Sequence, residues 1–352
     1  MSRWTIAKNQ VKREASPFPY KNSLPELILW YSGLSKHFDI RSQVMTNLHT
    51  AISKGIDWIL SQQEVDGSWR ADFGFRHGSS TSWTTAFVGN RIPISSDCRE
   101  LVKARNFLMG NRKPHPDYQL GWGYNSLTVP DFDSTLEAMQ FLKEQLADVL
   151  NPSVFLHLYE KGGFSTYTPE DACKLNPGIA TYGWTSPHLE IATNVRQLVS
   201  ELGYQGMVAL TDEAIMNHLL TRGYCAYWHH RPIVAAGLVM QSGISLSKLP
   251  PPPLSADPEQ LDWEVINNPF VTAMALEAAL LWDSQLYESV IKLLIQQLLN
   301  TQRPDGSWRP YLVLSVPYPD AYDPREVQHI NADFGKPLVT AATVINVLSK
   351  VA

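Results

Sequence analysis

The stretch KGIDWILSQQEVDGSW, residues 54–69, has a second copy, LLIQQLLNTQRPDGSW, at residues 293–308. In each copy a helical apolar pattern leads to a Gln and then to Asp-Gly-Ser-Trp. Shorter, degenerate copies end with GWGY at 121–124 and GGF at 162–164. Recurrence of one pattern along a chain is the signature of a repeat architecture. The copies therefore predict a fold made from one helical unit used several times.

A second helical pattern follows most copies. It reads SWTTAFV at 82–88, DSTLEAM at 133–139, VTAMALEAAL at 271–280 and VTAATVINVL at 339–348. The unit is therefore a helix, a turn rich in Gly and aromatic residues, a loop and another helix, and no run of period-two alternation indicates strands. We expect about six such units to close into an all-α fold, an α/α barrel whose inner helices line a cavity.

The turn of each copy is expected to join neighbouring outer helices. Gly67 and Gly306 permit a positive φ at a helix end. Either Gln62 or Gln63, and Gln302 in the later copy, can hydrogen-bond the free groups of a helix end. The tryptophan that closes each copy then packs over that end.

Composition and charge exclude several classes of protein. The 352 residues are 44% hydrophobic and 18% charged with a net charge of −5, and no basic run is present, so nucleic acid is not an expected partner. Cys98, Cys173 and Cys225 have no CxxC spacing, which indicates reduced thiols and a cytoplasmic protein. The N-terminus lacks the apolar segment of a signal peptide, and no apolar run is long enough to span a bilayer.

The domain organisation is predicted to be simple. Residues 1–39 are rich in Pro and polar side chains and are expected to form an N-terminal arm. Residues 40–352 keep the helical pattern throughout and are expected to form a single barrel domain. The proline run at 250–253 is expected to be a stiff loop inside that domain, because the helical pattern resumes after it.

The repeated turn resembles the QW motif of squalene–hopene and oxidosqualene cyclases, which belong to the terpenoid cyclase family. In that motif a basic residue and Gly precede an aromatic or aliphatic residue, a Gln and Gly-x-Trp. The matching residues are Lys54, Gly55, Trp58, Gln62, Gly67 and Trp69 in the first copy, and Leu298, Gln302, Gly306 and Trp308 in the second. The resemblance covers residues 40–350 and implies that these residues lock helices together and do no chemistry.

The stretch PDFDSTLE, residues 130–137, resembles the acid motif of class II cyclases. Asp131 and Asp133 fit the Asp-x-Asp-Asp form of that motif without its last Asp. The Pro-x-x-Asp-Cys-Thr-x-Glu form also fits, with Ser134 in place of Cys. Both alignments imply that Asp133 is the proton donor. Protonation of an alkene needs an acid that is still protonated at rest, and burial beside a second carboxylate, here Asp131, raises a carboxyl pKa in that way.

Ser134 is expected to orient the acid through a hydrogen bond. The carbocation that forms is stabilised by aromatic faces, at roughly 2 kcal/mol for a desolvated contact. The candidates for substrate binding are the aromatic residues of the loops at the barrel mouth, with one histidine: Trp83, Trp122, Tyr124, Tyr167, Trp184, Tyr227, Trp228, His229 and Phe270.

A purely structural interpretation of the acid motif stands beside the catalytic one. Residues 134–137, STLE, have the S-x-x-E pattern of a capping box before an apolar helix. Asp133 would then only precede the cap and interact favourably with the helix dipole.

A zinc site is a further alternative. Protein prenyltransferase β-subunits share this barrel and bind zinc through Asp-x-Cys and a distant His, and Asp171, Cys173 and either His229 or His230 offer the same types. The flanking EDACKLNPG does not resemble that family. The structural alternative is that Asp171 begins a helix after Pro169 and that Cys173 is a small core residue.

Other histidines have candidate roles. His229 or His230 could be the base that ends a cation cascade, and His77, which follows Arg76, could bind an anionic head group. No DDxxD run is present, so ionisation of a diphosphate with magnesium is not expected, and we predict no metal or cofactor.

The function that these observations favour is proton-initiated cyclisation or isomerisation of a small isoprenoid or polyene in isoprenoid biosynthesis. The alternatives are a barrel that binds a hydrophobic ligand without catalysis and a zinc-dependent prenyltransferase-like subunit. Squalene cyclases have a second barrel that this chain lacks. The mouth therefore needs a cover, from the arm, a second copy of the chain or another partner, and peripheral contact with a membrane stays open.

Overall fold

The computed structural model of the chain describes residues 35–117, 119–151, 155–156, 158–160, 162–229, 231–326, 330–333 and 335–352. Residues Met45–Ala352 form one compact unit. Most of the predicted N-terminal arm, residues 1–34, lies outside the described residues. None of the helices in the described part of the chain combines the length and hydropathy that a bilayer-spanning segment needs.

The described residues form twelve α-helices. Six of them make an inner set: α3 (Ser82–Arg91), α5 (Phe132–Phe141), α7 (Leu189–Glu201), α9 (Pro232–Gln241), α11 (Pro269–Trp282) and α13 (Leu338–Ser349). The others are α2 (Ser35–Ser61), α4 (Arg99–Asn111), α6 (Pro169–Leu175), α8 (Gln205–Arg222), α10 (Trp263–Asn267) and α12 (Glu288–Thr301).

Three short antiparallel hairpins complete the described structure. They pair β1 (Lys113–His115) with β2 (Gln119–Gly121), β3 (Tyr159–Glu160) with β4 (Gly163–Phe164), and β5 (Leu312–Ser315) with β6 (Ile330–Ala332). Each hairpin lies in a connection between helices, so the strands are parts of loops and not of the helical ring.

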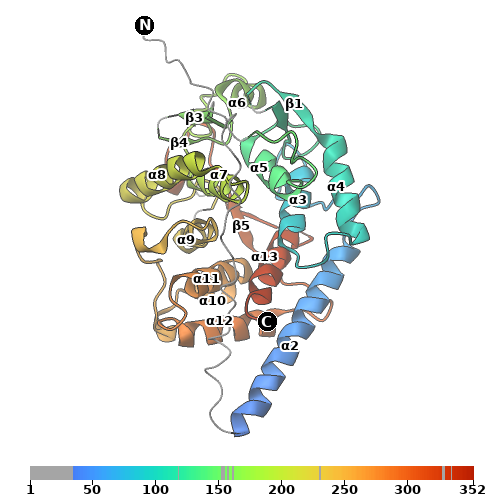
Figure 1. Cartoon of the computed structure of the whole chain (residues 1–352), viewed down its shortest axis with the longest axis vertical. Helices are drawn as coiled ribbons and strands as arrows, with labels where there is room; N and C mark the ends of the chain where they lie inside the picture. Colours follow the sequence, from blue (N-terminus) through green and yellow to red (C-terminus); the bar gives the residue numbers. More distant parts are fainter. Residues whose placement is uncertain are drawn as a thin grey trace. The chain divides into compact units, whose positions relative to one another are not determined.

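The inner helices form a closed ring. Each contacts the next in the order α3, α5, α7, α9, α11 and α13, and α13 contacts α3 again (Figure 1). Outer helices α4, α8 and α12 pack on α3, α7 and α11. Helices α11 and α13 are buried along almost their whole length, as expected for apolar helices covered on all sides. The prediction of an all-α, α/α barrel fold is therefore confirmed.

Tryptophans lock the ends of two outer helices, α2 and α12. The indole N–H of Trp69 donates to the carbonyl of Ile59 at 2.9 Å, and that of Trp308 donates to Leu298 at 2.8 Å. Both side chains are fully buried. Each indole thus adds a hydrogen bond to a carbonyl in the last turn of α2 or α12, and its ring covers the helix end.

Gln63 connects the first turn to the next outer helix. Its Nε2 donates to Gly67 O at 2.9 Å and to Glu100 O, on α4, at 2.7 Å. Gln62, which the motif alignment selected, donates only to the neighbouring Ser61 hydroxyl. That assignment is corrected to Gln63, because only a residue four positions before the glycine returns to its carbonyl.

Gln302 makes the equivalent contacts in the last turn. Its Nε2 donates to Gly306 O at 2.9 Å and to Ala51 O, on α2, at 2.8 Å. Gly306 has a φ of +92°, and a Cβ there would lie 2.2 Å from the carbonyl oxygen of Lys54. The turn after α12 therefore packs directly against α2. This contact joins the last and first outer helices and closes the outer layer.

Candidate active site

A cavity of about 460 Å³ lies among the first turns of α3 and α5 and the loops around them. This volume is within the usual range of ligand pockets, roughly 300–1,000 Å³. Its wall includes two carboxyl groups, Asp131 and Asp133, beside aromatic side chains. Segments 74–77, 175–179 and 314–319 add residues that are far apart in the sequence.

Asp131 is the N-cap of α5. Its backbone N–H donates to Trp122 O at 3.0 Å, which fixes it in an extended conformation directly before the helix. Its carboxyl group accepts the backbone N–H of Ser134 at 2.7 Å and the Ser134 hydroxyl at 2.8 Å. Burial raises the pKa of Asp131 to about 7, although the hydrogen bonds from Ser134 oppose the rise.

The capping box predicted at residues 134–137 is wrong. Ser134 already lies inside the first turn of α5, so it cannot be the cap, and its hydroxyl orients Asp131 rather than Asp133. Glu137 does not fold back to the helix start. Instead it forms a two-point ion pair with Arg91 of α3, with both N–O distances at 3.0 Å.

Asp133 lines the cavity from the first turn of α5 and is only partly exposed. Asn194 Nδ2 donates to its Oδ1 at 3.2 Å. Burial, followed by the nearby charges of Asp131, Glu137 and Glu190, raises the pKa of Asp133 well above its ordinary value. The indole N–H of Trp83 partly offsets this rise, although it is not aligned for a full hydrogen bond. This rise in the pKa favours the protonated form of the carboxyl group.

Five of the predicted aromatic residues line the cavity. Trp83 comes from the start of α3, and Tyr124, Tyr167, Trp184 and Trp228 come from loops. Tyr167 stacks on Trp184 with ring centroids 5.2 Å apart, and Trp184 meets Trp228 edge-on at 5.7 Å. The wall therefore presents several π-faces beside the two carboxyl groups, and such faces attract a cation.

The other four predicted substrate-binding residues do not line the cavity. Trp122 is fully buried over the end of α4, where its indole N–H donates to Leu108 O at 2.7 Å, as Trp69 does in its own turn. Tyr227 stacks on His188 and donates its hydroxyl to Ala321 O at 2.8 Å. Backbone carbonyls engage the polar groups of both side chains, which holds them in the protein core.

His229 and Phe270 pack on each other, with ring centroids 5.9 Å apart. His229 Nδ1 donates to Val313 O at 2.9 Å, and burial lowers its pKa to about 4. It does not line the cavity, so the structure does not place it as a base for the substrate. His230 lies outside the described residues.

The residues of the zinc alternative are not brought together. Asp171 accepts hydrogen bonds from His115 Nε2 at 2.9 Å and Thr168 Oγ1 at 2.6 Å, while Cys173 is exposed rather than in the core. Helix α6 does begin at Pro169, as expected. In the described part of the chain, no group of three or more His, Cys, Asp or Glu side chains is placed to hold a metal ion.

The cavity also contains a basic pair. Arg76 and His77 both line it, and Arg76 Nε donates to His77 Nε2 at 3.1 Å. The Arg76 Nη2 donates to Leu175 O at 3.2 Å and to the Asn176 side chain. Arg76 is exposed and forms no ion pair with any carboxylate that the structure describes.

Several other wall residues could not be predicted from the sequence. Thr166, Asn176 and segment 314–319 lie far after Asp133 in the chain, so no local spacing connects them with it. Residue 319 is 186 positions after Asp133 by difference (319 − 133). His188, which lies behind Thr166, directly precedes α7 and has no distinguishing neighbour in the sequence.

No protein-family model and no curated protein sequence matches the chain. Solved structures do match its fold. The type II terpene cyclase MstE from Scytonema, without ligand, matches with a TM-score of 0.70 and 21% identity over 87% of this chain and 98% of that chain. A variant of MstE in complex with its substrate, geranylgeranyl dihydroxybenzoate, matches with a TM-score of 0.71 and 21% identity over 88% of this chain and 98% of that chain. A protein from Actinoplanes matches with a TM-score of 0.69 and 22% identity over 86% of this chain and 98% of that chain. The chain therefore has the fold of a type II terpene cyclase.

Proposed function

We propose that the protein catalyses proton-initiated cyclisation or isomerisation of an isoprenoid, with Asp133 as the general acid. The observation that carries this proposal is a partly exposed carboxyl group, with a raised pKa, in the wall of an aromatic cavity. Asp133 is not used as a helix cap, because Asp131 has that role. Its side chain is therefore available to a ligand. The fold shared with MstE supports the same reaction class.

The chemistry follows from these groups. The Asp133 carboxyl proton adds to one carbon of an alkene, whose π-electrons form the new C–H bond and leave a cation on the more substituted carbon. The Asp133 carboxylate that remains is stabilised by the Asn194 amide N–H. The cation lies among the faces of residues such as Tyr167, Trp184 and Trp228, which lower its energy without adding a nucleophile.

The polar and apolar parts of the cavity support an amphiphilic substrate. Trp83, Tyr167 and Trp184 surround the acid with apolar surface suited to a polyprenyl chain. Arg76 carries a positive charge at an exposed position of the same wall. MstE is described with geranylgeranyl dihydroxybenzoate, a prenyl chain on an acidic aromatic head. We therefore propose an isoprenoid with an anionic head group as the substrate class.

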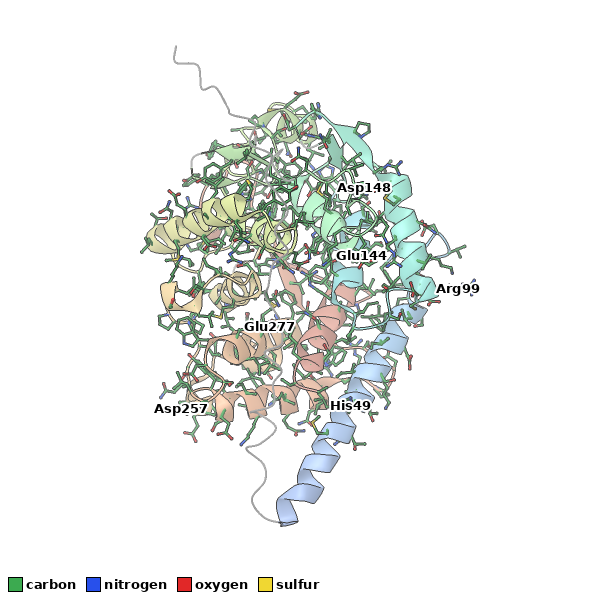
Figure 2. All side chains as sticks on the ribbon, viewed as in Figure 1. His49, Arg99, Glu144, Asp148, Asp257 and Glu277 are labelled. Atoms are coloured by element: carbon green, nitrogen blue, oxygen red, sulfur yellow. The ribbon has the colours of Figure 1, made fainter. Side chains whose placement is uncertain are left out.

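The test is incubation of the purified protein with geranyl, farnesyl and geranylgeranyl diphosphates, squalene and geranylgeranyl dihydroxybenzoate, with mass spectrometry of the products. We expect a cyclised or isomerised product from one of the prenyl substrates, and its loss in Asp133→Asn. The control is Asp148→Asn, at an exposed carboxylate that follows α5 outside the cavity (Figure 2).

Each result decides between the hypotheses. Unchanged product formation by a folded Asp133→Asn variant would refute Asp133 as the acid. If the wild type converts none of the five substrates but binds one of them, the barrel that binds a ligand without catalysis is favoured instead. Circular dichroism of both variants confirms that the fold is retained.

A further inference from the structure

A chain of hydrogen bonds leads from the cavity wall into the core. Trp228 Nε1 donates to Thr166 Oγ1 at 2.8 Å, and Thr166 Oγ1 is 2.7 Å from His188 Nδ1. On the other side of the ring, His188 Nε2 is 2.9 Å from Gly183 O. Thr166 and Trp228 line the cavity, whereas His188 is almost completely buried behind them.

The partners fix the direction of each hydrogen bond. A carbonyl oxygen only accepts, so His188 Nε2 carries a hydrogen and donates it to Gly183. Burial lowers the pKa of His188 to about 3, so the ring is neutral and Nδ1 has a free electron pair. The Thr166 hydroxyl hydrogen must therefore point to His188 Nδ1, because the indole N–H of Trp228 already donates to the Thr166 oxygen.

Aromatic rings pack against His188 on two sides. His188 stacks on Tyr227 with centroids 4.0 Å apart and an angle of 10°, and it meets Trp228 edge-on at 6.0 Å. A cation over an aromatic face is stabilised. The Glu190 carboxyl group holds both aromatic residues, since it accepts the backbone N–H of Tyr227 at 3.0 Å and of Trp228 at 2.6 Å.

We propose that the Thr166–His188 pair removes the proton that ends the reaction, with an alkene as product. This inference rests on the proposed function of the same cavity. Thr166 is the group that touches the substrate, and His188 acts through it as a positioning residue and proton acceptor.

A proton leaves the carbon next to the cationic carbon and binds to Thr166 Oγ1, and the electron pair of the broken C–H bond becomes the new C=C bond. The original Thr166 hydroxyl proton moves to His188 Nδ1. The product is an isomer of the substrate, Asp133 is a carboxylate and His188 is an imidazolium. After the product leaves, His188 Nδ1 returns its proton to Thr166 Oγ1, Thr166 releases a proton to water in the cavity, and that water protonates Asp133.

Opposite environments make the two groups suitable for opposite tasks. Burial and neighbouring charges raise the pKa of Asp133, which favours its protonated form, whereas burial lowers the pKa of His188, which keeps its ring unprotonated. Pairs of groups whose pKa values are separated in this way define acid and base. A carbocation is a far stronger acid than an imidazolium, so even a weakly basic ring accepts its proton.

The first test is the product ratio of variants. We expect Thr166→Val and His188→Gln to lower the ratio of alkene to water-captured alcohol by at least about tenfold, since general bases contribute roughly 10²–10⁴-fold. Thr166→Ser restores the alkene because it keeps a hydroxyl. The matched control is Thr211→Val, at a buried threonine of α8 that bonds only backbone carbonyls outside the cavity. A wild-type ratio in both Thr166→Val and His188→Gln, or an alcohol as the wild-type product, overturns the proposal.

The second test needs no turnover. The chain has 10 histidines, and in ¹⁵N-histidine NMR spectra the signal that is lost in His188→Gln identifies His188. We expect a neutral Nε2–H ring from pH 5 to 8, and a shift of the Nδ1 signal alone in Thr166→Val. If His188 carries its hydrogen on Nδ1, or if its ring titrates between pH 5 and 8, the proposed role of the Thr166–His188 pair is overturned. Refutation of the proposed function is distinguishable from refutation of this inference, because in the first case the Asp133→Asn variant still forms product.

Discussion

Asp131 accepts both the backbone N–H and the hydroxyl of Ser134, at 2.7 and 2.8 Å. The two carboxyl groups at the start of α5 therefore have different tasks. One holds the helix end and supplies a nearby negative charge, and the other faces the cavity. The order along the chain explains this division, because the cap must precede the helix while a residue of the first turn can project from it.

Asp131→Asn is expected to change the pH dependence of the reaction rather than the fold. Asn is as good an N-cap as Asp, but the variant lacks the charge that raises the pKa of Asp133. The active form is protonated Asp133, so activity is lost as pH rises through its pKa. A lower pKa moves that loss to lower pH. A profile of kcat/KM against pH measures the shift, and an unchanged alkaline limb with wild-type stability contradicts it.

Gln63→Ala should destabilise the barrel, whereas Gln62→Ala should not. Gln63 donates to two backbone carbonyls, on its own turn and on α4. An unsatisfied buried polar group costs about 1–3 kcal/mol. Gln62 bonds only its neighbour Ser61, so its loss should lie within about 0.5 kcal/mol. Urea unfolding of both variants measures the two free energies of unfolding. Equal decreases in these free energies would contradict the assignment of Gln63 as the residue that joins the turn to α4.

Gly306→Ala is expected to cost more than Gly203→Ala. Both glycines have a positive φ, +92° and +79°, so both substitutions strain the backbone by about 1 kcal/mol or more. Only at Gly306 does the added Cβ meet another backbone, at 2.2 Å from Lys54 O, while nothing lies within 4 Å at Gly203. The difference between the two melting temperatures isolates the contact between the last turn and α2. A similar decrease in both would show that this contact is easily displaced.

Asp333→Asn is expected to stabilise the protein at alkaline pH. The buried Asp333 accepts the N–H groups of Val339 and Thr340 at the start of α13, and burial raises its pKa to about 8. Its Oδ1 has no hydrogen-bond partner among the residues that the structure describes. A raised carboxyl pKa stabilises the fold at pH below the unfolded value, near 4, and this stability is lost as pH rises through about 8. Asn keeps the acceptor without a charge.

The measurement for Asp333 is thermal unfolding of wild type and variant from pH 5 to 9. The advantage of the variant should grow with pH and reach on the order of a few kcal/mol at pH 9, since one pKa unit corresponds to ~1.4 kcal/mol. If the difference between the two proteins is constant across this range, Asp333 does not titrate there.

The fold could be predicted because its decisive contacts are local in sequence. Gly67 and Trp69 act on the helix that immediately precedes them, so their spacing is visible in the chain. The same logic indicates the place of Trp122, whose GWG context matches the turn pattern. It was nevertheless assigned to the cavity, because aromatic character alone does not say which side of a helix a ring will cover.

The candidate acid was predictable for the same reason, and the rest of the site was not. Asp133 lies at a helix start, and its distance from Asp131 is fixed by two residues of sequence. Thr166, His188 and segment 314–319 meet only after the ring has closed. Spacing along the chain contains no information about such contacts. The choice between Gln62 and Gln63 also depended on geometry, namely which side chain returns to Gly67 O.

The contact of Gln302 with Ala51 joins residues 251 positions apart, and this has a consequence for how the protein is made. Open solenoids need special capping repeats, because their first and last units each leave one apolar face uncovered. In this protein the first and last repeats cover each other. During synthesis on the ribosome, α2 therefore cannot make this contact until α12 has emerged. The entropic cost of closing so long a loop then falls on one late step of folding.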